Sequence, residues 1–108
     1  PARALIAAGA AVALATDYNP GTSPTTNLPL ILTIGVSQLR MSVAEVVIAA
    51  TVNGSAAVGR AADVGQIAPG FSADLALFDV HDVRELPYWY GESLCRASWA
   101  RGQPCHRS

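Results

Sequence analysis

The first sixteen residues are almost wholly apolar and divide into two parts. Residues 1–9 are rich in alanine and end at Gly9, a pattern typical of the last turns of a helix. Ala11–Thr16 is a short, unbroken apolar stretch, which favours a strand buried on both faces. Such a strand requires parallel neighbours, and no other stretch of the chain matches it. We therefore expect the chain to be an incomplete part of a larger α/β fold.

Two further helices are predicted in the middle of the chain. Residues 27–39 are apolar nearly all round, and Asn27 is a suitable N-cap residue. Ser42 and Glu45 have the spacing of a capping box, in which each side chain satisfies a backbone amide of the same helix start. Residues 51–54 interrupt this second helix. Both helices need partners on several sides to cover their apolar faces.

The pattern changes after residue 60 and becomes typical of short strands. Residues 65–79 predict two strands around the turn at Pro69 and Gly70. In Leu94–Arg101 apolar and polar residues alternate in part, which predicts a later strand. After it, residues 102–104 would form a turn that leads into a short tail.

Composition limits the classes of partner. Of the 108 residues, 51% are hydrophobic and 14% charged, which is apolar for a small free-standing domain. The net charge of -1 provides no attraction to nucleic acid or to an anionic membrane. No apolar run reaches the roughly 18 residues that span a bilayer, since Ala4–Thr16 is too short and residues 28–39 contain Pro29 and Gln38. Cys95 and Cys105 are expected to be free thiols. Neither His81 nor His106 has a partner at metal-ligand spacing, so we expect both to be surface residues.

Asp17 is the candidate for chemistry. It follows the predicted strand directly, at the end where α/β folds place their active sites, and a turn cluster of Asn19, Pro20 and Gly21 comes next. An aspartate in this place can bind a cation, a metal or a proton. It can equally cap the turn by bonding the backbone two residues on. Local sequence leaves both interpretations open.

Three motifs carry a resemblance to a known family. The run Ala-Thr-Asp-Tyr-Asn-Pro-Gly-Thr-Ser-Pro-Thr occupies residues 15–25. Residues 65–75 follow the pattern Gly-x-Ile-x-x-Gly-x-x-Ala-Asp-Leu, and residues 85–91 read Glu-Leu-Pro-Tyr-Trp-Tyr-Gly. In collinear order over most of the chain, these motifs resemble the imidazolonepropionases of the amidohydrolase superfamily.

The resemblance implies a fold and a site. The fold would be α/β: residues 1–62 would supply the last strand and helices of a TIM-type (β/α)8 barrel, and residues 63–108 strands of a small composite β-sandwich. Asp17 would be both the catalytic residue and the last ligand of a Zn or Fe ion. Asn19, Gly21 and Thr22 would bind substrate. Asn53 would be structural, bonding backbone at the helix break.

The resemblance also implies a reaction, the hydrolysis of 4-imidazolone-5-propanoate to N-formimidoyl-L-glutamate in histidine degradation. The partners would be this small substrate and the rest of the barrel, in the cytoplasm, with a homodimer left open and no nucleic acid or membrane. The family's other metal ligands, among them a His-x-His pair, are absent from the chain. We therefore expect these 108 residues to be inactive alone.

Two alternatives remain open at this point. The chain could belong to another cyclic amidohydrolase, such as a dihydroorotase- or deaminase-like enzyme, although the Asn-Pro-Gly after Asp17 argues against it. It could instead be a non-catalytic interaction module, since a high apolar fraction also suits a surface that docks onto a partner.

Overall fold

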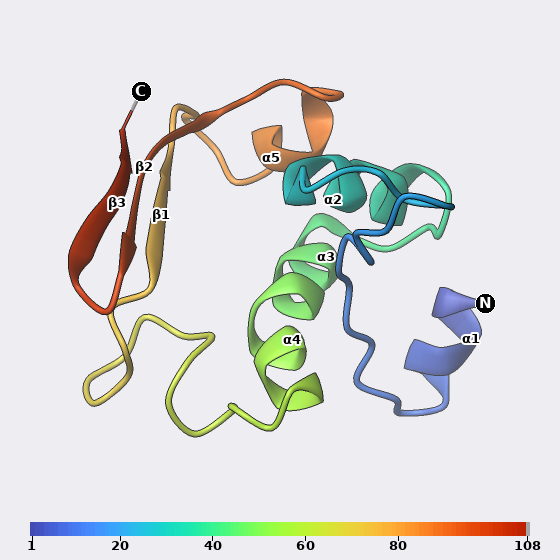
Figure 1. The fold of residues 1–108 in the computed structure, drawn as a ribbon. Coiled ribbons are helices and arrows are strands. Elements are labelled where there is room, and N and C mark those ends of the chain that lie inside the picture. The colour runs from blue at the N-terminus through green and yellow to red at the C-terminus, as the bar shows by residue number, and fades with distance from the viewer. Residues whose placement is uncertain (108) are drawn as a thin grey trace.

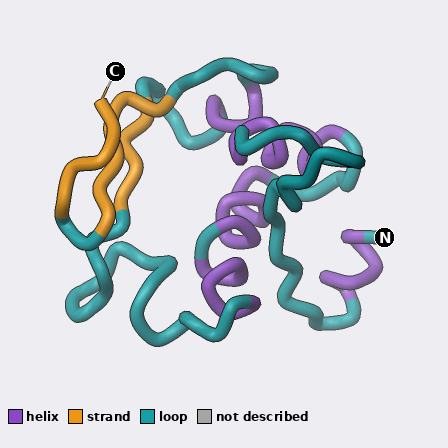
Figure 2. Tube along the Cα trace, in the orientation of Figure 1, coloured by secondary structure: helices purple, strands orange, loops and turns teal. Residues whose placement is uncertain are grey.

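The computed structural model describes residues 1–107. Helices gather on one side of the molecule, and a three-stranded antiparallel sheet lies on the other (Figure 1). The N-terminus lies beside the first helix, and the described part of the chain ends with the last strand of the sheet. Long loops, rather than regular elements, join α1 (Ala2–Ala7) to α2 (Leu28–Ser37) and α4 (Val52–Ala57) to β1 (Leu75–Phe78) (Figure 2). The chain is therefore a mixed α/β structure in which most of the helices precede the sheet and a short helix, α5 (Glu85–Tyr88), lies between its first two strands.

The helices begin where the sequence predicts them. The predicted N-terminal helix is α1 (Ala2–Ala7), and Gly9 follows it with a positive φ of 89°. Helix α2 (Leu28–Ser37) starts at Asn27, whose Oδ1 accepts a hydrogen bond from the Leu30 amide at 3.1 Å. The capping interaction that the sequence predicts at Asn27 is thus confirmed.

The predicted capping box is also formed. Helix α3 (Val43–Ala50) starts at Ser42, whose Oγ accepts from the Glu45 amide at 3.1 Å. Glu45 Oε1 accepts in return from the Ser42 amide at 2.8 Å. The interruption is shorter than predicted: it falls at Thr51 alone, and residues 52–54 are already part of the next helix, α4 (Val52–Ala57). Local side-chain bonds to backbone amides therefore define the start of this helical pair.

A small hydrophobic core lies among α1, α2 and α3. Its buried members are Ala2, Leu32, Met41, Val46 and Ala49. Gly35 allows the two longer helices to approach closely, because a Cβ atom built on it would lie 2.8 Å from Val46 Cγ1. This spacing leaves no room for a methyl group between α2 and α3.

The strand predicted at Ala11–Thr16 is not formed. The structure assigns this segment to a loop, in which Val12, Leu14 and Thr16 are half-buried while the residues between them are exposed. The Leu14 amide donates to the Ala49 carbonyl at 3.1 Å, and Asn53 Nδ2 donates to the Val12 carbonyl at 2.9 Å. Within residues 1–107 no parallel strand lies beside the segment, and a strand exists only through its ladder bonds to a neighbour. Asn53 is structural, but it bonds this segment and not the helix break.

The sheet has the strand order β1-β2-β3, with β1 (Leu75–Phe78), β2 (Cys95–Ala100) and β3 (Gln103–Arg107). The strand predicted at Leu94–Arg101 is confirmed as β2. The prediction of a tail after it is wrong, since the chain turns back and pairs as β3. The prediction of two strands around Pro69 and Gly70 is also wrong, because only β1 forms in that region.

The turn between β2 and β3 explains the second hairpin. Arg101 and Gly102 connect the paired residues Ala100 and Gln103, and their φ values are 50° and 79°. Two central residues with positive φ define the turn whose twist matches paired antiparallel strands. Asp74 accepts from the Arg101 amide at 2.8 Å, so this acid supports the turn from the edge of the sheet.

Helix α5 (Glu85–Tyr88) carries the Glu-Leu-Pro-Tyr motif and packs on α2. The hydroxyl of Thr33 donates to the Pro87 carbonyl at 2.8 Å in a buried contact. This bond fixes the segment between β1 and β2 against the helical side of the molecule. The two thiols, Cys95 and Cys105, form no disulfide, as expected.

Candidate functional site

Asp17 lies at the start of a loop that leads from residues 11–16 to α2. Its side chain is exposed, and its backbone has a positive φ of 50°. Aspartate tolerates this left-handed conformation better than most residues, but it still carries a steric cost of about 1 kcal/mol. Strained backbone of this kind concentrates at functional sites. The geometry thus makes Asp17 an exposed carboxylate on a backbone that the loop must hold in place.

Asn19 is the centre of this loop. Its Oδ1 accepts from the Gly21 amide at 2.9 Å and from the Thr22 amide at 2.8 Å. Its Nδ2 donates to the Asp17 carbonyl at 2.7 Å and to Thr22 Oγ1 at 3.0 Å. Both hydrogens of the amide group and both lone pairs of its oxygen are therefore in use. The capping interaction at this turn comes from Asn19 and not from the Asp17 side chain.

The structure brings Asp17, Asn19, Gly21 and Thr22 together, as their closeness in sequence predicts. It also shows that the polar groups of the last three satisfy one another. Gly21 packs closely on this network, since a Cβ atom at this position would lie 3.3 Å from Asn19 Oδ1. Of the four predicted site residues, Thr22 keeps one lone pair of its hydroxyl and Asp17 keeps its carboxylate for a ligand that leaves the network intact.

Sequence reasoning did not single out Ser23. The Asn19 amide donates to the Ser23 carbonyl at 3.0 Å, and the Ser23 amide donates back to the Asn19 carbonyl at 3.3 Å. The Ser23 hydroxyl donates to the carbonyl of Thr16, the residue before Asp17. A single sequence could not indicate this contact, because the partner of the Ser23 hydroxyl is a backbone carbonyl and not a recognisable side chain.

Asp17 has no companion ligands in this part of the chain. Among residues 1–107, no three His, Cys, Asp or Glu side chains lie close enough to hold a metal ion. Hydrolytic zinc sites use at least three protein ligands. One exposed carboxylate can serve as a single ligand of a metal site whose other ligands lie outside the described residues. It cannot form a complete site by itself. No reaction step through a metal follows from this chain by itself.

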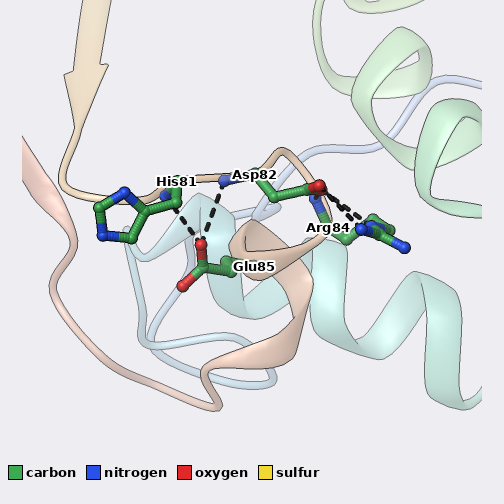
Figure 3. A network of polar contacts seen from close by, with 4 residues as sticks. All are labelled: His81, Asp82, Arg84 and Glu85. Carbon is green, nitrogen blue, oxygen red and sulfur yellow. Dashed lines mark hydrogen bonds and ion pairs between the residues drawn. The ribbon is translucent and has the colours of Figure 1, made fainter.

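A second polar network lies around α5 and joins His81, Asp82, Arg84 and Glu85 (Figure 3). Glu85 Oε2 accepts from the His81 amide at 2.7 Å and from the Asp82 amide at 3.1 Å. Glu85 Oε1 accepts from Trp89 Nε1 at 3.2 Å, and these bonds hold the pKa of Glu85 below its usual range, that of Trp89 having the largest effect.

The other acids of this region pair with arginines. The guanidinium of Arg84 donates to the Asp82 carboxylate at 2.9 Å and lowers the pKa of Asp82 to about 2. Asp79 pairs with Arg96 at 3.0 Å. His81 is exposed, as expected, and meets Glu85 through its backbone amide rather than its imidazole. The expectation that His106 is exposed concerns a side chain outside the described part. These contacts are structural: they close the turn into α5.

In the described residues, no helix has the length and apolar character needed to cross a membrane.

Comparison with known proteins adds the decisive observation. The model of the amidohydrolase family matches residues 1–101, which is nearly the whole chain. The chain belongs to the amidohydrolase family. This confirms the family to which the three sequence motifs point, and membership implies that the chain is part of a TIM-barrel fold.

Similar members of the family carry a single name. The imidazolonepropionase of Solibacter usitatus is 42% identical over 106 residues, covering 98% of this chain and 25% of that protein. The imidazolonepropionase of Geobacillus sp. WCH70 is 51% identical over 90 residues, covering 83% of this chain and 21% of its own length. That of Bacillus thuringiensis is 45% identical over 100 residues, covering 93% and 24%. This amidohydrolase chain thus spans about a quarter of the length of the curated relatives it matches.

Proposed function

We propose that this chain supplies the C-terminal part of an imidazolonepropionase, including one metal ligand and a substrate loop. The enzyme hydrolyses 4-imidazolone-5-propanoate to N-formimidoyl-L-glutamate in histidine degradation, in the cytoplasm. The observation that carries the proposal is the loop around Asp17: an exposed carboxylate on a strained backbone, held by a closed network of hydrogen bonds. The relatives named imidazolonepropionase, at 42% and 51% identity, support it.

In this proposal Asp17 has two roles. Its carboxylate is one ligand of a Zn or Fe ion whose other ligands come from residues outside those described. When bound, such an ion lowers the pKa of water and polarises a carbonyl group. A carboxylate beside the attacking water accepts its proton as the new C–O bond forms. Asp17 then returns that proton to the ring nitrogen as the C–N bond breaks, a general acid–base contribution of about 10²–10⁴ in rate.

Asn19, Gly21 and Thr22 form the substrate loop of the proposal. Thr22 is the best placed of the three, because its hydroxyl keeps an acceptor lone pair for a polar edge of the substrate. Asn19 and Gly21 contribute by keeping that hydroxyl and Asp17 on one rigid loop. A direct contact from Asn19 would require one of its bonds within the loop to be exchanged for a bond to the ligand.

The proposed macromolecular partner is the rest of a (β/α)8 barrel, with residues 1–62 in the barrel and residues 63–108 in a small composite β-sandwich. Exposed apolar side chains support this: Val58 is 73% and Ile67 91% exposed. An open cavity of about 860 Å³ lies between α3–α4 and the sheet, with Val47, Phe78 and Trp99 in its lining. Surfaces of this kind are stable only when another part of a protein covers them.

The test is a chimera in which this chain replaces the matching quarter of the Geobacillus kaustophilus imidazolonepropionase, to which it is 49% identical over 90 residues. We expect the chimera to hydrolyse 4-imidazolone-5-propanoate with bound metal. Asp17→Asn should lose at least 10²-fold in kcat and retain less metal, because a neutral amide is a poor ligand and accepts no proton.

Asp79→Asn is the matched control, since Asp79 is an exposed aspartate that only pairs with Arg96. It should retain both activity and metal. An Asp17→Asn chimera with normal turnover and full metal content would refute the role of Asp17. A folded chimera that hydrolyses dihydroorotate in place of the imidazolone ring would transfer the proposal to another branch of the family.

A further inference from the structure

Ser23 connects the end of the Asp17 loop to its beginning. Its backbone pairs with Asn19 through two hydrogen bonds of 3.0 and 3.3 Å, which close residues 19–23 into a ring. Its half-buried hydroxyl donates to the Thr16 carbonyl. The ring is therefore attached to the chain just before Asp17 by one side-chain bond.

The two peptide groups on either side of the Asp17 Cα atom are both held. Ser23 Oγ holds the Thr16 carbonyl, which precedes this atom, and Asn19 Nδ2 holds the Asp17 carbonyl, which follows it, at 2.7 Å. Fixing both peptide planes fixes the φ and ψ of the residue between them. The φ of 50° is one that a non-glycine residue rarely adopts without such constraints.

We propose that Ser23 is a positioning residue for Asp17, which aims the carboxylate by holding the peptide group before it. The proposal rests on the proposed function, because it assigns Ser23 a part in the reaction of Asp17. A displacement of about 1 Å in a reacting group can cost up to 10²-fold in rate. The hydroxyl is the only side-chain group of Ser23, so alanine removes the attachment and threonine keeps it.

Loss of the hydroxyl should affect turnover more than binding. In Ser23→Ala, the backbone bridge to Asn19 and the bonds between Asn19 and Thr22 remain, so the ring keeps its shape and the Thr22 hydroxyl its place. Only the ring's attachment to Thr16 is lost, and Asp17 is freed to leave its positive φ. We expect kcat of the chimera to fall roughly tenfold or more, while KM stays within about twofold.

Two variants separate positioning from general stability. Ser23→Thr should restore kcat to within about threefold of the unmodified chimera. Ser37→Ala is the matched control, because Ser37 Oγ also donates to one backbone carbonyl, that of Thr33 at 2.8 Å, and lies outside the loop. It should leave kcat unchanged. A Ser23→Ala variant with unchanged kcat, or one that Ser23→Thr does not rescue, would overturn the proposal.

A structural readout does not depend on the reaction. Crystal structures of the unmodified chimera and of Ser23→Ala report the φ of Asp17 directly. We expect a positive φ in the first and a negative or mixed φ in the second. An unchanged positive φ in Ser23→Ala would overturn the positioning role whatever the kinetics. A well-folded but inactive chimera whose Asp17 shifts on Ser23→Ala would instead refute the proposed function and leave the positioning of Asp17 supported.

Discussion

Gly35 offers a sharp test of how closely α2 and α3 pack. Replacing a helical glycine by alanine normally stabilises a helix by about 1 kcal/mol. At Gly35 the new methyl group would lie 2.8 Å from Val46 Cγ1 and 3.1 Å from Leu14 Cδ1. Carbon atoms prefer 3.5–4.0 Å. Val46 is fully buried, so it has little space into which to move.

The overpacking at this position outweighs the gain in helix propensity. Inserting a methyl group into a packed core costs about 1–3 kcal/mol. With the gain of about 1 kcal/mol set against the upper part of that range, Gly35→Ala should lower the free energy of unfolding by about 1–2 kcal/mol. Val46→Ala removes the closest atom at a cost of about 2 kcal/mol through lost burial and a cavity. The double variant should then be more stable than the sum predicts, by about 1 kcal/mol.

Gly54 provides the matched control, because it is also helical and its added Cβ would have its nearest contact at an ordinary 3.5 Å. Gly54→Ala should stabilise by about 0.5–1 kcal/mol. The assay is the urea midpoint of the helical circular dichroism signal of the chimera, because the 108-residue chain alone is expected to self-associate. A Gly35→Ala variant as stable as Gly54→Ala, or strict additivity with Val46→Ala, would refute the packing argument.

Three further predictions follow from other contacts. Asn53→Ala should lower stability by about 1–3 kcal/mol in thermal melts, because it leaves the half-buried carbonyl of Val12 without its donor; an unchanged melting temperature would contradict this. Asp82 has a lowered pKa, so its stabilising contribution is present above its unfolded pKa of about 4 and is lost as pH falls through about 2. Arg84→Ala should move that titration back toward pH 4 in carboxyl NMR, and no shift would count against the ion pair. The 108-residue chain alone should bind Zn²⁺ weakly by calorimetry, hydrolyse no imidazolone ring and self-associate in ultracentrifugation; metal-dependent activity of a monomer would oppose our interpretation.

Local signals in the sequence predicted the helices well. Asn27 and the Ser42–Glu45 pair act on amides three residues away, so their spacing alone contains the geometry. The strand β2 was likewise readable from alternation. The Arg101-Gly102 turn was missed because a two-residue hairpin needs positive φ at both positions. Arginine is not among the residues, such as Asn, Asp and Gly, whose presence indicates such a turn.

Features that depend on distant partners could not be predicted in the same way. Ala11–Thr16 has the composition of a buried strand, but the strand needs neighbours that residues 1–107 do not provide. At the candidate site, the motif located Asp17, Asn19, Gly21 and Thr22. The motif did not reveal that the side-chain amide of Asn19 forms its hydrogen bonds within the loop, or that Ser23 closes the loop. Both depend on where backbone carbonyls point.

The bond from Asn53 to Val12 has a consequence for the chemical ageing of the protein. Asn53 precedes Gly54, and asparagine followed by glycine is the dipeptide most prone to deamidation in flexible chains. Here Asn53 lies within α4, and the nitrogen of its side-chain amide donates to the carbonyl of Val12, 41 residues away in the sequence. Deamidation would replace that donor with a carboxylate oxygen facing the Val12 carbonyl, two acceptors with no hydrogen between them. The bond that joins α4 to the segment before Asp17 thus also protects a labile residue. Its loss by spontaneous chemistry would leave that segment held to the helices by the bond from the Leu14 amide to the Ala49 carbonyl.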